Sequence, residues 1–230
     1  MPRVEPTVRV LLAVALGCCS DDASAADLST WSGLEQALGA SANLVCGYSQ
    51  ETTENGATRV EQFVGGANRE WSLLTVDGNV PTQSELNDYA KGTEQRAERT
   101  SPISLNVSNL VISDSVTALS NQDGLIEYRF RLRPEKPDLA EITKALQGSA
   151  IVEGGKADRI KFVLTNTRPA AYSLTFKVSN YQREINFEWQ PRWNAFFRTS
   201  ESTHVNGKLF GLKSVSISTE VRYFDFACRV

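Results

Sequence analysis

The chain has 230 residues, of which 24 are basic, 27 are acidic and one is histidine. A formal net charge of −3 argues against nucleic acid or an acidic membrane surface as the main partner. One histidine cannot build a histidine-based metal cluster, and the four cysteines lack zinc-finger spacing. We therefore expect neither a metal nor a cofactor.

The N-terminus has the pattern of an export signal. Arg3 and Arg9 form a basic region that leads into the apolar segment Val10–Leu16. That segment is too short for a membrane span, which takes about twenty apolar residues. We predict a signal peptide over 1–25 and a single exported domain over 26–230, with no transmembrane segment in the mature chain.

Two processing routes fit this segment. Ala23-Ser24-Ala25 has the small-x-small pattern of ordinary signal peptidase cleavage. Alternatively, the sequence that ends at Cys18 resembles the lipobox of bacterial lipoproteins, in which the cysteine becomes the acylated first residue, although Ala15 stands where leucine is usual. We favour ordinary cleavage and keep a lipid anchor at Cys18 as the alternative.

Removal of the signal leaves Cys46 and Cys228 as the only cysteines of the mature chain. An even pair in an oxidising compartment favours a disulfide, which would close most of the chain into one loop. The alternative is a pair of buried free thiols or one exposed thiol.

The first elements of the mature domain follow clear local signals. Apolar residues at three- and four-residue spacing predict an amphipathic helix over 28–42, with Ser29 or Thr30 as its N-cap. Asn55-Gly56 then predicts a hairpin turn between strands over 44–52 and 58–64, since Asn-Gly is the strongest short hairpin signal.

The next stretch reads as a strand, a turn and a capped helix. Trp71 to Val76 is rich in aromatic and β-branched residues, and Asp77-Gly78-Asn79 supplies the turn. Thr82 and Glu85 form a capping box that opens a charged helix from Gln83 through Glu94 toward Arg99. The apolar residues within 101–113 predict either a short lid or a buried crossing.

The C-terminal half alternates between apolar and polar residues, which is typical of strands with one apolar face. The alternating segments lie around 126–132, 160–164, 174–178 and 185–189, and the last long strands are expected over about 195–204 and 213–228. Turns are expected at Asn121–Gly124, Glu153–Gly155, Ser179-Asn180 and Asn206-Gly207. A second helix is expected over Leu139–Gln147, opened by an Asp138–Glu141 capping box and closed by Gly148. The fold class is α+β: a curved antiparallel sheet with helices over its apolar face.

The catalytic inventory is sparse. His204 lies beside an expected turn and is predicted to be exposed, and no G-x-S-x-G elbow provides a nucleophile. The strand patterns place nearly all acidic residues outside the apolar face. A carboxylate-based hydrolase or isomerase is therefore a minority hypothesis, and we expect a protein that is not an enzyme.

Large apolar side chains gather on one predicted sheet face. Ordinary core packing explains any one of them, but the whole set would also suit a curved sheet that closes around an apolar ligand cavity. The candidate cavity residues are Tyr48, Trp71, Leu73, Tyr128, Phe130, Phe162, Phe176, Phe187 and Trp189.

The segment WSLLTVDGNVPTQSEL, residues 71–86, resembles a signature of exported bacterial proteins of the LolA/LolB-like lipoprotein-carrier group. Weaker similarity extends from Asn55-Gly56 to the terminal segment Val221–Phe226. The resemblance implies an open half-barrel with helices plugging its concave face, and a periplasmic location. It also implies a cavity for the acyl chain of a lipid or lipoprotein, although no lipid-gating residue can be mapped onto this chain.

Two functional hypotheses from different classes follow. The first is a periplasmic, non-enzymatic carrier that binds an acyl chain, another lipid or a lipoprotein in the half-barrel. The alternative is an envelope structural or interaction module, whose own helices fill the core and whose outer face binds an envelope protein.

Overall fold

The computed structural model describes residues 28–66, 70–92, 104–120, 125–134, 140–153, 158–173 and 175–229. The predicted signal peptide, Cys18, Asp138 and the turn Asn121–Gly124 lie outside these ranges, as do Gly154-Gly155 and the predicted continuation of the charged helix from Gln83 past Gly92. Every helix in the described ranges falls short of the length and apolarity needed to cross a membrane.

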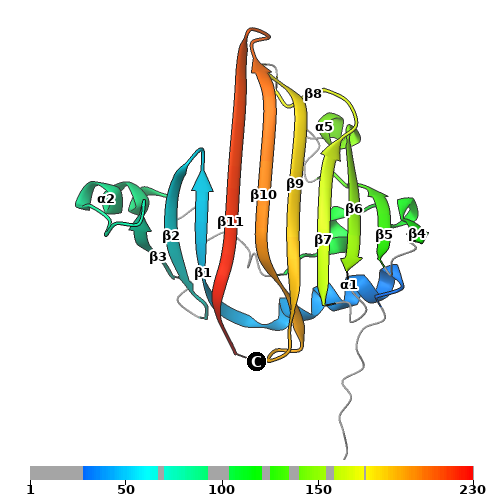
Figure 1. The fold of residues 1–230 in the computed structure, drawn as a ribbon, viewed down its shortest axis with the longest axis horizontal. Coiled ribbons are helices and arrows are strands. Elements are labelled where there is room, and N and C mark those ends of the chain that lie inside the picture. The colour runs from blue at the N-terminus through cyan, green and yellow to red at the C-terminus, as the bar shows by residue number, and fades with distance from the viewer. Residues whose placement is uncertain are drawn as a thin grey trace, which may run out of the picture.

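Within the described ranges, the fold is built on one open, 11-stranded antiparallel sheet in the order β3-β2-β1-β11-β10-β9-β7-β6-β5-β4, with β8 paired to β9 (Figure 1). The strands are β1 (Val45–Glu54), β2 (Ala57–Val64), β3 (Glu70–Val76), β4 (Thr117–Ser120), β5 (Ile126–Arg131), β6 (Leu146–Glu153), β7 (Arg159–Asn166), β8 (Ala170–Ala171), β9 (Phe176–Gln190), β10 (Ala195–Leu209) and β11 (Lys213–Arg229). The antiparallel sheet with few helices confirms the α+β fold class in this general form.

The order of the strands brings the first strand beside the last. β1 begins a three-stranded meander, β11 ends a second meander, and the antiparallel β1–β11 ladder is their only junction within the sheet order. The stability of that junction therefore determines whether the two meanders form one sheet.

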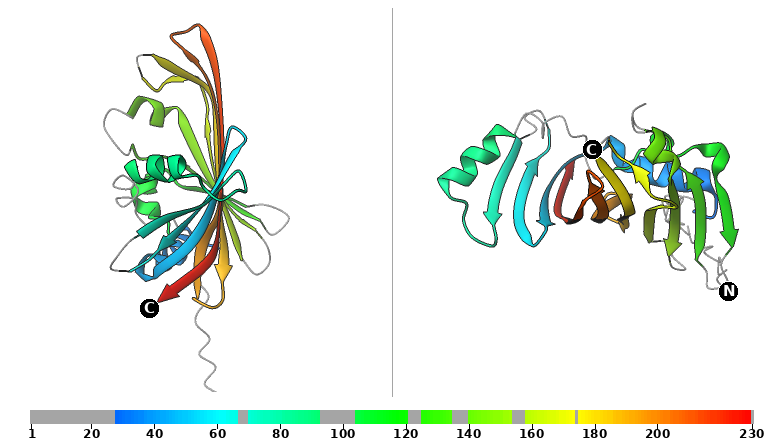
Figure 2. Two further views of the ribbon diagram at one scale, coloured as in Figure 1. Left: turned by 90° about the vertical axis from the view of Figure 1, so that its left-hand side faces the viewer. Right: turned by 90° about the horizontal axis from the view of Figure 1, so that it is seen from above.

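The helices are short and lie on one side of the sheet (Figure 2, left). They are α1 (Trp31–Gly39), α2 (Gln83–Lys91), α4 (Val107–Leu110) and α5 (Ala140–Lys144), with 3₁₀ turns at Ala40–Asn43 and Ser113–Ser115. α1 begins as expected, because the Thr30 hydroxyl accepts a hydrogen bond from the Gly33 amide at 3.1 Å. The helix was expected to continue to residue 42, but the chain forms a 3₁₀ turn over Ala40–Asn43 instead.

The capping box of α2 is confirmed. The Thr82 hydroxyl accepts from the Glu85 amide at 3.3 Å, and the Glu85 carboxylate accepts from the Thr82 amide at 2.7 Å. These bonds to Thr82 lower the pKa of Glu85. The predicted hairpin turn is also confirmed, with φ of 49° at Asn55 and 92° at Gly56 between β1 and β2.

Two predicted turns are wrong. Ser179-Asn180 lies inside β9 and Asn206-Gly207 lies inside β10, where the two strands pair with each other through a register shift. The backbone makes a β-bulge there, so the Asn and Gly signals mark an irregular strand and not a reversal. The chain reverses beyond this point, at Phe210-Gly211 between β10 and β11.

The second predicted helix is also corrected. α5 has only five residues, and the chain from Leu146 onward is β6. Gly148 does not end a helix but pairs with Phe130 across the sheet, where the Phe130 ring occupies the space that a side chain would need. Tertiary packing overrides the local helix signal here.

We expect Gly148→Ala to lower the free energy of unfolding by about 1–3 kcal/mol, because the new methyl group overlaps the Phe130 ring in a packed core. The measurement is urea unfolding followed by tryptophan fluorescence. Gly39→Ala is the matched control: it has open space around it and a right-handed backbone, so about 0–0.5 kcal/mol of stabilisation is expected. Equal effects at the two glycines would contradict the packing argument.

The face of the sheet that carries Tyr48, Phe162 and Phe187 is called the inner face below. It holds the larger of two separate cores and the part of the smaller core formed by Tyr48, Phe63 and Trp71. In the larger one, Leu34 and Leu38 of α1 belong to the same cluster as the aromatic residues of β5, β7 and β9, and the Trp31 ring centroid lies 5.5 Å from those of Tyr128 and Phe130. Val107 and Val111, both buried, join it, so the apolar part of 104–113 is a buried crossing and not a lid. The smaller core lies over β1, β2, β3 and the ends of β10 and β11.

Candidate functional site

Most of the predicted cavity residues pack against one another. Tyr128, Phe130, Phe162 and Phe187 are buried in the larger core, with Trp189 at its margin. The ring centroids of Phe162 lie 6.0 Å from those of both Phe130 and Phe187, which is normal contact between aromatic side chains.

Tyr48 and Trp71 belong to the smaller core instead. Their ring centroids are 5.7 Å apart in an edge-to-face arrangement, and Phe63 packs on both rings. The structure therefore divides the predicted aromatic set between two packed clusters and does not arrange it around one cavity.

Phe176 and Leu73 lie elsewhere, each in the wall of a pocket. Phe176 lines a pocket of about 540 Å³ between α5, the segment around Leu110 and strands β6, β7, β9, β10 and β11. We call it the central pocket. Its walls are mostly apolar, and its residues are Leu110, Leu132, Arg133, Ile142, Thr143, Leu146, Leu164, Tyr172, Phe176, Val178, Tyr181, Arg183, Val205 and Ile217.

Leu73 lines a second pocket, of about 620 Å³, between α2 and strands β1 to β3. Glu54, Arg59, Glu85 and Asp88 also line it, so charged groups surround its apolar floor. Of the two, the central pocket has the more continuous apolar lining.

A charged cluster adjoins the central pocket on the inner face. The Arg183 Nε lies 2.8 Å from one oxygen of Glu201, and an Nη of Arg198 lies 3.1 Å from the other. The Arg198 guanidinium also stacks over Phe187, 5.8 Å from the ring centroid. Two cations share one carboxylate in this largely buried cluster, which leaves it with a net positive charge.

The pKa values of Arg183 and of two neighbouring phenols are shifted from their ordinary values. Burial tends to lower the pKa of Arg183, but the nearby Glu201 carboxylate outweighs it, so the pKa is raised. Burial raises the pKa of Tyr181 and of Tyr223, the two phenols beside the cluster. Arg183 is therefore a fixed cation at the wall of the central pocket, and both phenols stay protonated near neutral pH.

Glu61 is a second acidic residue on the inner face, and sequence reasoning missed it. Its side chain is 1% exposed and accepts a hydrogen bond from Gln50 Nε2 at 2.6 Å, with Arg59 Nε at 3.4 Å. The sequence does contain a signal for this position. Glu61 is two residues before Phe63 on β2, and residues two apart in a strand share a face.

The two inner carboxylates do not form a catalytic pair. The strand pairings run from β2 to β10 through β1 and β11. Glu61 on β2 is opposite Gln50 on β1, and Gln50 is opposite Tyr223 on β11. Val221 on β11 is opposite Glu201 on β10. Glu61 and Glu201 are thus on strands three positions apart, roughly 14 Å at the usual strand spacing. Each is bound to arginine, so this pair does not provide the adjacent acid and base that a carboxylate hydrolase needs.

His204 is exposed, as predicted. Its Nδ1 lies 3.0 Å from the Ser218 hydroxyl. Ser218 lines neither the central pocket nor the pocket beside α2. Within the described ranges, no group of three or more His, Cys, Asp or Glu side chains is placed to hold a metal ion.

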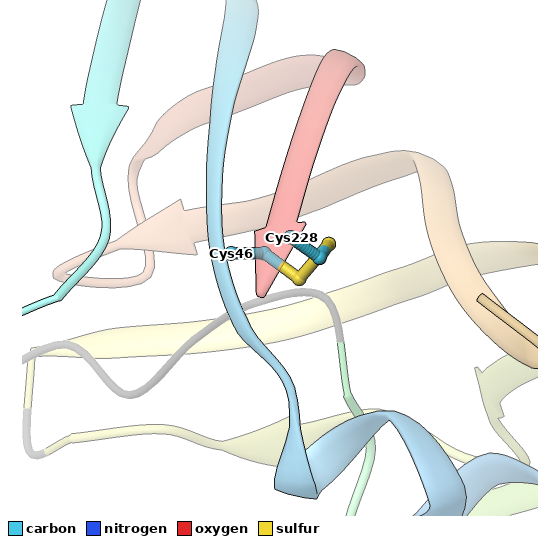
Figure 3. The surroundings of a disulfide bond; sticks show 2 residues. All are labelled: Cys46 and Cys228. Carbon is cyan, nitrogen blue, oxygen red and sulfur yellow. A yellow bond between two sulfur atoms is a disulfide. The ribbon is translucent and has the colours of Figure 1, made fainter. Parts of the chain in front are cut away.

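The predicted disulfide is present. Cys46 on β1 and Cys228 on β11 are directly opposite in the ladder, and their sulfurs are 1.98 Å apart (Figure 3). The bond spans 182 residues of sequence and lies at the end of the junction between the two meanders.

The geometry defines an α+β protein with an open antiparallel sheet, a mostly apolar central pocket and a charged cluster beside it. Comparison with protein-family models, curated proteins and solved structures finds no match to this chain. The LolA/LolB-like resemblance thus depends on the motif at residues 71–86 and on the weaker similarity from Asn55-Gly56 to Val221–Phe226.

Proposed function

We propose that this protein is an exported, periplasmic, non-enzymatic binding protein for an acyl chain, carried by a lipid or a lipoprotein. The observation that supports the proposal most directly is the central pocket. Its volume of about 540 Å³ falls in the range of small-molecule sites, and its walls are mostly apolar. In this proposal the sheet corresponds to the open half-barrel of LolA/LolB-like proteins.

The ligand residues in this proposal differ from the aromatic set. Phe176 is the one predicted cavity residue in the central pocket, where Val178, Leu164 and Val205 would contact the acyl chain. Arg183 lies at the same wall and would attract the polar end of an amphiphilic ligand. The packed aromatic residues support the sheet beneath the pocket.

Val205→Trp tests the pocket, because the larger side chain would occupy space that the acyl chain needs. We expect the purified protein to bind a fluorescent fatty acid. The affinity of the variant for this fatty acid should be lower by about tenfold or more. His204→Trp is the matched control. His204 is the neighbour of Val205 on β10, so its side chain is on the opposite face of the strand, and it is exposed. Circular dichroism checks that both variants fold.

Native mass spectrometry of the protein purified from the envelope provides the second measurement, and bound lipid should appear there before delipidation. Failure of the wild-type protein to take up any fatty acid or lipid would refute the carrier proposal. An equal loss of binding in both tryptophan variants would refute the assignment of the ligand to the central pocket.

The second candidate is an envelope interaction module, which the two filled cores favour. In that case the inner face is occupied by the protein's own side chains and the functional surface is external. Pull-down from envelope extracts would then recover a specific protein partner, and Val205→Trp would leave that recovery unchanged.

A further inference from the structure

The hairpin of β10 and β11 extends beyond the ends of the other strands, at the top of Figure 1. Its turn is Leu209–Leu212, closed by a hydrogen bond from the Leu212 amide to the Leu209 carbonyl at 3.1 Å. Two large apolar side chains are in this turn, with Phe210 70% exposed and Leu212 88% exposed. We call residues 208–213 the hairpin tip.

The backbone of the hairpin tip is unusual for these residues. Phe210 has φ of 53° and Gly211 has φ of 73°, so both central residues of the turn are left-handed. Turns of this kind ordinarily carry Asn, Asp or Gly at the first position, and a bulky side chain is disfavoured there. The chain therefore accepts an unfavourable conformation at the residue that exposes an aromatic ring.

This end of the sheet is also basic. Segments 165–182 and 203–219 contain Arg168, Lys177, Lys208 and Lys213 but no Asp or Glu. Lys177 and Lys208 are directly opposite each other on β9 and β10, an arrangement that disfavours the sheet through like-charge repulsion.

We propose that the hairpin tip docks on the surface of an anionic lipid bilayer. Phe210 and Leu212 enter the boundary between head groups and acyl chains, while Lys208 and Lys213 contact the lipid phosphates. Exposed apolar side chains flanked by lysines are the combination that holds proteins at such interfaces. The near-neutral charge of the whole chain does not oppose this, because the basic residues are concentrated at one end.

Size favours a bilayer over a protein as the partner. A stable protein interface takes about 800 Å² from each side, which is far more than one protruding turn offers. A bilayer needs only a few apolar side chains and a few cations to bind a protein reversibly.

Docking would also bring the central pocket close to the membrane. The Phe210 amide donates to the Thr175 carbonyl at 2.6 Å, and the Tyr172 amide donates to the Phe176 carbonyl at 2.9 Å. The hairpin tip therefore contacts the turn that carries Tyr172 and Phe176 of the pocket wall. The docking inference itself does not depend on what the pocket binds.

The test is co-sedimentation of the purified protein with vesicles of phosphatidylcholine alone or mixed with phosphatidylglycerol. The protein carries Cys18→Ser, so that acylation cannot anchor it. We expect binding to the anionic vesicles that weakens with salt, and a loss of about tenfold or more in Phe210→Ser/Leu212→Ser. Each of Lys208→Gln and Lys213→Gln should cost about fivefold.

Val80→Ser is the matched control, because Val80 is an equally exposed apolar residue, 86% exposed, outside the hairpin. It should bind the vesicles as the wild-type protein does. Val205→Trp should also bind them, which separates failure of docking from failure of the proposed ligand site.

Three results would overturn the inference. The first is absence of binding to anionic vesicles, and the second is equal binding by the wild-type protein and Phe210→Ser/Leu212→Ser. The third is self-association of the wild-type protein in sedimentation velocity that the same double variant abolishes. Phe210 and Leu212 would then form a contact between two copies of the chain.

Discussion

Removing the disulfide through Cys46→Ala/Cys228→Ala is expected to lower the free energy of unfolding by about 2–5 kcal/mol. The bond closes a loop of 182 residues, so its loss restores much conformational freedom to the unfolded chain. It also lies at the end of the β1–β11 ladder, the junction between the two meanders. The measurement is urea unfolding under oxidising conditions.

Reduction provides the control for this prediction. Dithiothreitol should bring the wild-type protein to the stability of the double alanine variant and should leave the variant unchanged. Hydrogen exchange should show the largest loss of protection in β1 and in the part of β11 paired with it. If the variant were as stable as the oxidised wild-type protein, the junction would not depend on the bond.

Glu201→Gln is expected to lower the free energy of unfolding by about 3 kcal/mol. The substitution keeps the shape of the side chain but removes the carboxylate that Arg183 and Arg198 share. Removing one member of a buried ion pair is costly, because the other charge stays in the interior without compensation. Urea unfolding measures the loss.

The matched control is Glu188→Gln on β9. Glu188 pairs with Arg159 at 3.8 Å, but both side chains are largely exposed, so a change within about 0.5 kcal/mol is expected. Adding Arg198→Met to Glu201→Gln should recover part of the stability, since it removes a cation that has lost its partner. Equal effects of the two glutamine substitutions would show that the cluster is effectively solvated.

Local sequence signals predicted several elements well because the forces involved are local. The capping box of Thr82 and Glu85 satisfies amides within one turn of helix, and Asn55-Gly56 suits left-handed backbone without help from the rest of the fold. The apolar alternation of β5, β7 and β9 likewise reports which face each strand buries.

The same kind of signal was misleading where packing decided the outcome. Gly148 and the residues before it resemble the end of a helix, but strand pairing and the space needed by the Phe130 ring make that segment part of β6. Ser179-Asn180 and Asn206-Gly207 resemble turns, but long strands continue through them as a paired bulge.

The candidate site was only partly predictable. Alternation identified Phe162 and Phe187 as inner-face residues, but it could not tell a side chain that fills a core from one that lines a pocket. That difference depends on what packs above each residue, such as Leu34 and Leu38 of α1 over the larger core. Phe176 lines a pocket on the same face of the sheet.

The amino-acid sequence by itself determined the fold class, the local caps and turns governed by nearby atoms, and the pair of cysteines available for a bond. Only the tertiary structure decided that β1 pairs with β11, which brings Cys46 against Cys228. It also decided that the aromatic residues form two cores while Arg183 and Phe176 line a pocket. The reason is physical: these outcomes depend on contacts between residues far apart in the chain, which periodicity and spacing do not encode.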